Sequence, residues 1–171
     1  MTGVQTCALP ISQWRITRKE EWDPWRFANG GNLNASAAVT ASNKLGTLRF
    51  TDVIPDPGSD PVHQATVVVA ETFDKLTYRV RIAKRKAGDD YQVSFTLSGT
   101  PPEKRVPEKG EKPEDKARLD KDFAESLKAL KERIASEKAL AQWTYVVASA
   151  EVEPLLKSRA EMTAPKNANK K

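Results

Sequence analysis

The chain has 171 residues and carries 28 Lys and Arg against 23 Asp and Glu, which gives a formal net charge of +5. A chain of this length buries about two thirds of its unfolded surface, so it can fold as one domain without a disulfide or a metal. No apolar run approaches about 18 residues, which excludes a transmembrane helix within this sequence. A single His and a single Cys are too few for a zinc site, a disulfide or a Cys-His nucleophile pair. We therefore expect no metal, no cofactor and no enzymatic activity.

The first residues differ from the rest of the chain. The segment 2–11 carries no charge and no helical or strand period, and it resembles the translation of a short-read sequencing adapter. We therefore assign residues 1–12 to an adapter-derived artefact, and we expect the natural sequence to begin near Ser12 with its true amino terminus missing. Cys7 then does not belong to the natural protein. A short disordered leader or the stub of a signal peptide is the alternative.

The sequence after this segment predicts a hairpin followed by a helix. Residues 14–18 alternate apolar and polar side chains, and a turn signal separates them from a second short strand at 25–28. The Ala-rich stretch 33–45 predicts a helix that begins after Asn34 as its N-cap and stops at Gly46.

Apolar side chains at every second position mark the middle of the chain as an antiparallel meander. A short strand is expected at 48–54, and further strands at 66–70, 76–82 and 91–97. Period-two alternation places one set of apolar side chains on a common face, namely Leu76, Tyr78, Val80, Ile82, Tyr91, Val93, Phe95 and Leu97. The polar residues between them face water.

A long charged helix is predicted after the meander. Residues 100–113 are rich in Pro, Lys and Glu and form a loop, whereas residues 114–140 continue as one helix. Its apolar residues recur at steps of four, four, three and four, at Leu119, Phe123, Leu127, Leu130 and Ile134. We interpret this set as a candidate partner surface, because the expected helix is longer than the sheet on which it packs.

Together these elements predict an α+β fold. An antiparallel β-sheet carries the Ala-rich helix, the long charged amphipathic helix and a short C-terminal helix that follows a strand at 143–147. We expect one domain at 13–160 and a disordered basic tail at 161–171.

One basic cluster is a candidate anion-binding site. It lies on and after one predicted strand and comprises Arg79, Arg81, Lys84, Arg85 and Lys86. Basic residues of the long helix alternate with acidic ones, which is typical of a solvated helix face rather than of a surface that follows nucleic-acid phosphates. Phosphate-binding loops and nucleophile motifs are absent from the sequence. We therefore expect no nucleic-acid partner. The alternative function is that of a domain whose basic cluster binds an anionic ligand, namely a glycan, a lipid headgroup or nucleic acid.

Four stretches resemble one family. They are 48–53, 72–78, 111–123 and 143–159, and within the third the run Glu111-Lys-Pro-Glu-Asp-Lys is the most specific. Together they resemble the domain of unknown function 4340 family, in the form found in envelope proteins of Verrucomicrobia-like bacteria. The resemblance covers nearly all of 14–159. The sequence departs from the family at Lys75, where Gly is expected in a hairpin turn, and at Glu153, where Asp is usual.

The resemblance implies a location and a kind of partner. Such proteins are membrane-anchored and extracytoplasmic, and many are encoded beside an ABC transport system of the gliding-motility type. The expected function is therefore a non-enzymatic accessory module of a bacterial membrane complex, with protein partners in that complex. The resemblance also implies an anchor helix, which would lie in the missing part upstream of Ser12. The family offers no catalytic residues to transfer.

Overall fold

The computed structural model describes residues 3–7, 14–54, 65–86, 88–107 and 110–165. The fold is α+β, as the sequence predicts. The elements, in chain order, are β1 (Gly3–Cys7), β2 (Trp14–Thr17), β3 (Arg26–Phe27), α1 (Ala35–Thr47), β4 (Asp52–Ile54), β5 (Thr66–Glu71), β6 (Leu76–Lys84), β7 (Tyr91–Gly99), α2 (Pro113–Leu140), β8 (Thr144–Val147) and α3 (Ser149–Leu156).

The strands form one antiparallel sheet in the order β3-β2-β1-β5-β6-β7-β8-β4. The predicted meander is its centre, since β6 pairs with β5 and with β7. Val80 lies opposite Val68 on one side and Phe95 on the other, so these three side chains share a face. The predicted hairpin of β2 and β3 is also present, with Ile16 opposite Phe27.

Residues 3–7 form a strand that the sequence analysis did not predict. β1 pairs with β2 and with β5, and Val4 lies opposite both Ile16 and Ala70. The sheet of the domain predicted at 13–160 therefore also includes these five residues. Two neighbouring strands satisfy the backbone N–H and C=O groups of β1, so it needs no side-chain pattern of its own. Its origin in adapter DNA stays a prediction.

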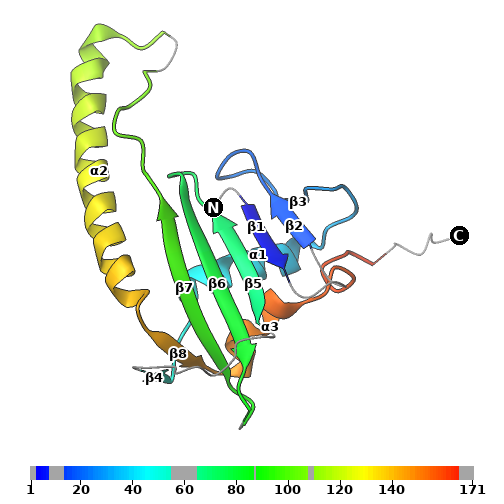
Figure 1. Ribbon diagram of the computed structural model, residues 1–171. Helices are drawn as coiled ribbons and strands as arrows, with labels where there is room; N and C mark the ends of the chain where they lie inside the picture. The colour runs from blue at the N-terminus through cyan, green and yellow to red at the C-terminus, as the bar shows by residue number, and fades with distance from the viewer. Residues whose placement is uncertain (1–2, 8–13, 55–64, 87, 108–109, 166–171) are drawn as a thin grey trace, which may run out of the picture.

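One face of the sheet carries the hydrophobic core, and Figure 1 shows α1 and α3 behind the sheet on that side. We call it the inner face. Fully buried sheet residues such as Trp14, Ile16 and Val68 pack there against α1 and α3. Ala38 and Ala41 are fully buried, because their small side chains let α1 approach the strands closely.

The start of α1 agrees with the prediction, and its end differs. The Asn34 side-chain oxygen accepts a hydrogen bond from the Ala37 N–H at 3.1 Å, which caps the helix. Gly46 does not end the helix, which continues to Thr47. Lys44 near its end donates to Glu151 of α3 at 2.9 Å, and this ion pair joins the two helices.

The predicted disordered tail at 161–171 is wrong for its first residues. Met162 is fully buried in the core, and its carbonyl accepts a hydrogen bond from the Asn34 N–H at 2.9 Å. Ala164 donates to the Asn32 carbonyl at 2.8 Å. One apolar residue that fills a core position keeps this segment ordered, so the domain extends past 160 to at least 165. Residues 166–171 lie outside the described part of the chain.

Candidate functional site

The long helix is present as predicted, but it is weakly buried. α2 has 28 residues, which at about 1.5 Å per residue is about 42 Å. None of its described side chains is fully buried. All five residues of the predicted apolar set, which we call the α2 stripe, are half-buried: Leu119, Phe123, Leu127, Leu130 and Ile134. Figure 1 shows the helix standing beside β7 at the margin of the sheet. The apolar side of α2 is therefore incompletely covered by the described part of the chain.

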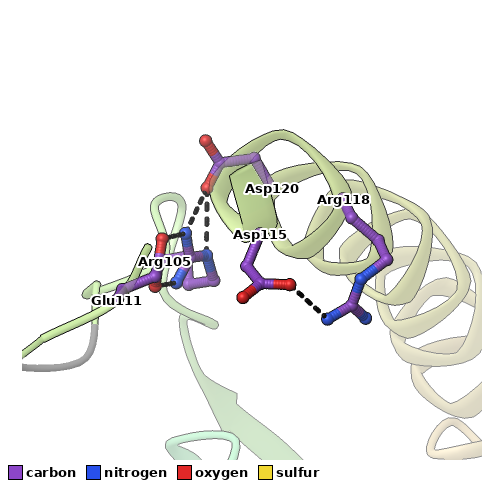
Figure 2. Close-up of polar contacts among 5 residues, drawn as sticks. All are labelled: Arg105, Glu111, Asp115, Arg118 and Asp120. Atoms are coloured by element: carbon purple, nitrogen blue, oxygen red, sulfur yellow. Dashed lines mark hydrogen bonds and ion pairs between the residues drawn. The ribbon is translucent and has the colours of Figure 1, made fainter. Parts of the chain in front are cut away.

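An arginine clamp fastens the N-terminal half of α2 to the preceding loop (Figure 2). Arg105 donates through both Nη atoms to the two carboxylate oxygens of Glu111. Its Nε and Nη2 also donate to Asp120 of α2 at 2.9 and 2.7 Å. The Arg105 side chain is 15% exposed, so this bidentate contact is well shielded from water. Asp115 and Arg118 form a separate pair along the helix at 3.4 Å.

A second polar contact fastens the C-terminal half of α2 to the sheet. The Tyr78 hydroxyl on β6 donates to Glu137 Oε2 at 2.5 Å. Arg133 lies 3.6 Å from both Asp74 and Glu137. Burial raises the pKa of Tyr78 to about 12, and the hydrogen bond to Glu137 adds to this shift. The phenol therefore stays protonated near neutral pH and serves as a hydrogen-bond donor rather than as a base.

A cavity of about 500 Å³ opens between the end of α1, the inner face of the sheet and the end of α2. We call it the α2 groove. Its apolar lining includes Leu45, Leu48, Phe50, Val80, Phe95, Leu140 and Tyr145. Phe50 is 59% exposed and Leu140 is 52% exposed, so large apolar side chains reach solvent here. A cavity of this size and lining matches the usual character of binding pockets in proteins.

The groove and the α2 stripe share one side of the helix. Leu130, Ile134 and Glu137 follow at steps of four and three, which puts them on one helix face. Glu137 lines the groove and contacts Tyr78. The stripe therefore extends the groove along α2 toward the N-terminal end of the helix.

The polar side chains that line the groove are engaged with their neighbours. Tyr78, Arg133 and Glu137 bind one another, and the Tyr145 hydroxyl donates to the Leu140 carbonyl at 2.8 Å. Within the described ranges, no group of three or more His, Cys, Asp or Glu residues is placed to hold a metal. The chemistry that this arrangement offers is burial of apolar surface inside a charged rim.

The structure divides the predicted basic cluster. Arg79 and Arg81 lie in mid-strand on β6 and are exposed on the face opposite the core. Lys84 stands at the end of β6, 3.5 Å from Asp89, and Arg85 and Lys86 follow it into the turn before β7. Strand alternation and the turn separate these residues, so the five do not form one site.

Sequence reasoning missed three features of the groove. Phe50 and Leu140 line it from a segment before β4 and from the last residue of α2, neither of which belonged to a predicted site. Tyr78 and Glu137 are 59 positions apart, so no local spacing indicates their contact. The sequence contains a local signal only for Leu140. It is an apolar residue that lies outside the α2 stripe, on a helix whose other faces are mostly charged.

Comparisons with protein-family models, curated proteins and solved structures gave no match to this chain. The resemblance to the domain of unknown function 4340 family therefore stays a prediction. Of the helices in the described part of the chain, none is both long and apolar enough to cross a membrane.

Proposed function

We propose that this chain is a non-enzymatic binding module whose α2 groove and α2 stripe receive an amphipathic helix of a partner protein. One observation carries the proposal: an open apolar cavity of about 500 Å³ adjoins a 28-residue helix with no fully buried side chain. Apolar surface of this extent favours a partner that removes it from water.

The shape of the surface favours a helix as the partner. Stripe residues repeat at steps of three and four, which is the spacing that packs against a second helix. A partner helix lying along α2 would cover the stripe and insert an apolar side chain between Phe50 and Leu140. Arg133 and Glu137 at the rim would meet the polar flank of that helix.

The resemblance supplies the wider setting of the proposal. It supports an extracytoplasmic accessory module in a bacterial membrane complex, associated with a gliding-type ABC transport system. The partner helix would then belong to another subunit of that complex. This setting rests on the resemblance, whereas the docking surface rests on the geometry of α2 and the sheet.

Photo-crosslinking tests the docking surface in cells that carry the gene. A photoreactive benzoylphenylalanine replaces Leu140 at the groove, and in the control variant it replaces Lys128, which is exposed on another side of α2. We expect position 140 to crosslink to a protein, with the attachment mapped by mass spectrometry to an amphipathic helix. Equal crosslinking at both positions, or attachment of lipid at position 140, would overturn the proposal.

A further inference from the structure

The face of the sheet opposite the core is open over its three central strands. We call this the outer face of β5, β6 and β7. All of its side chains are exposed or half-buried, including Val67, Arg79, Arg81, Ser94 and Thr96. Figure 1 shows these strands in front of α1 and α3. Side chains on this face are therefore available to a ligand.

Two arginines at the centre of this face have no acidic partner among the described residues. Arg79 and Arg81 are two positions apart on β6, so their Cα atoms are about 6.6 Å apart on the same face. Within the described ranges, neither one forms an ion pair. By contrast, Arg15 on β2 lies 3.4 Å from Glu71, and Arg133 pairs with Asp74. Two adjacent free guanidinium groups favour an oxyanion, which each can bind in bidentate fashion.

A row of hydroxyl groups runs beside the two arginines. On β7, Thr96 lies opposite Arg79 and Ser94 lies opposite Arg81. On β5, the residues opposite these arginines are Val69 and Val67. The arginines therefore have polar neighbours on one side that can both donate and accept hydrogen bonds.

We propose that the outer face around Arg79 and Arg81 binds an acidic polysaccharide. Carboxylate or sulfate groups of the glycan would accept hydrogen bonds from the guanidinium groups, and Ser94 and Thr96 would bind its hydroxyls. This site is on the other side of the sheet from the α2 groove, so it adds to the proposed function and does not depend on it.

The composition of this face disfavours other polyanions. None of the described outer-face residues of β5, β6 and β7 is aromatic, whereas proteins that bind single-stranded nucleic acid stack its bases on aromatic rings. The large apolar side chains with high exposure, Trp22, Val39, Phe50, Val106 and Leu140, all lie outside this face. Among the described residues, this face therefore has no large, highly exposed apolar side chain to insert into a membrane.

Calorimetric titration of the whole chain with alginate oligosaccharides tests the site. The variant Arg79→Gln/Arg81→Gln removes both free guanidinium groups, and Lys121→Gln/Lys128→Gln removes the same charge from exposed positions of α2. We expect at least tenfold weaker binding in the arginine variant and less than a twofold change in the lysine variant. Raising the salt concentration should weaken binding to the wild-type chain.

Two further probes distinguish the ligand classes. An oligothymidylate and phosphatidylglycerol vesicles are titrated under the same conditions, and circular dichroism checks that both variants stay folded. Weaker binding of both probes than of alginate supports the proposal. Equal losses in the two variants, lack of alginate binding by the wild-type chain, or tighter binding of the oligonucleotide or the vesicles would each overturn it.

Discussion

Lys75 occupies a backbone conformation that suits glycine better than lysine. Its φ is 63°, in the left-handed region, at the turn between β5 and β6. The turn is held by the Lys75 N–H, which donates to the Thr72 carbonyl at 3.2 Å, and by the Thr72 N–H, which donates to the Leu76 carbonyl at 2.9 Å. A side chain with a Cβ atom costs free energy there that glycine avoids.

We expect Lys75→Gly to stabilise the protein by about 0.5–1 kcal/mol, because it removes this strain without altering the turn. Urea unfolding followed by circular dichroism measures the change. A lower free energy of unfolding in the variant would contradict the interpretation of the turn.

Gly99, across the same end of the sheet, should respond in the opposite sense. Its φ is 104°, and a Cβ atom built there would lie 2.2 Å from the Lys75 carbonyl oxygen. Gly99→Ala should therefore destabilise the protein by more than about 1 kcal/mol in the same urea experiment. An unchanged midpoint would show that the two strands are not this close.

The Tyr78 phenol should lose its proton at a higher pH than an exposed tyrosine, because burial raises its pKa. Its folded-state pKa of about 12 lies above the ordinary value of 10.0, so its contribution to stability is complete below pH 10 and is lost as the pH rises through 12. In an ultraviolet titration, Glu137→Gln should lower this pKa, since the carboxylate opposes ionisation of the phenol. The variant Tyr78→Phe lacks this phenol, so the transition that it loses is the one that belongs to Tyr78. A Tyr78 transition at pH 10 in the wild-type chain would contradict the contact.

At the scale of elements, the Arg105 clamp decides how firmly the first half of α2 is held. Lysine keeps the charge but cannot reproduce the bidentate geometry toward Glu111 together with the contact to Asp120. We expect Arg105→Lys to speed amide hydrogen exchange in 110–125 and to leave β5, β6 and β7 unchanged. As a matched control, Arg118→Lys alters an exposed arginine of the same helix. Similar exchange rates in both variants would show that the Arg105 contacts do not stabilise the first half of α2.

The elements whose apolar residues repeat at a regular spacing could be predicted from the sequence. Alternation fixed the faces of β6 and β7, and Val80 and Val93 are buried as that pattern requires. The α2 stripe likewise predicted the long helix. By contrast, Met162 is a single apolar residue with no periodic neighbours, so nothing local indicated that it completes the core. The candidate groove escaped prediction for a related reason, because it forms where α1, α2 and the sheet meet.

At the scale of the whole molecule, β1 joins two parts of the sheet. On one side are β2 and β3, and on the other are β5, β6, β7, β8 and β4. Gln5 lies at the centre of β1, opposite Arg15 of β2 and Val69 of β5. Backbone pairing therefore connects the two parts at this strand.

We expect Gln5→Pro to lower the thermal unfolding midpoint, because proline removes a backbone donor within a strand paired on both sides. Gln5→Thr keeps that donor and should leave the midpoint nearly unchanged. Equal midpoints for the two variants would show that 3–7 are dispensable to the fold, as their predicted origin in adapter DNA would suggest.

The sheet presents different chemistry on its two sides. The apolar α2 groove lies at one end of the inner face, and the outer face carries Arg79 and Arg81 of β6. We propose that a partner helix occupies the first and an acidic glycan the second, so a binding module can hold two different partners at once. The groove is the central claim, since it combines two large exposed apolar side chains, Phe50 and Leu140, with a helix that has no fully buried side chain.

The most direct measurement of that claim is calorimetric titration of the chain with a synthetic peptide of the helix that crosslinks at position 140. We predict a negative heat-capacity change, because binding buries apolar surface. Leu140→Glu should weaken the affinity at least tenfold, whereas Lys128→Glu should change it less than twofold. Equal affinities of the two variants for the peptide, or binding without a heat-capacity change, would contradict the account.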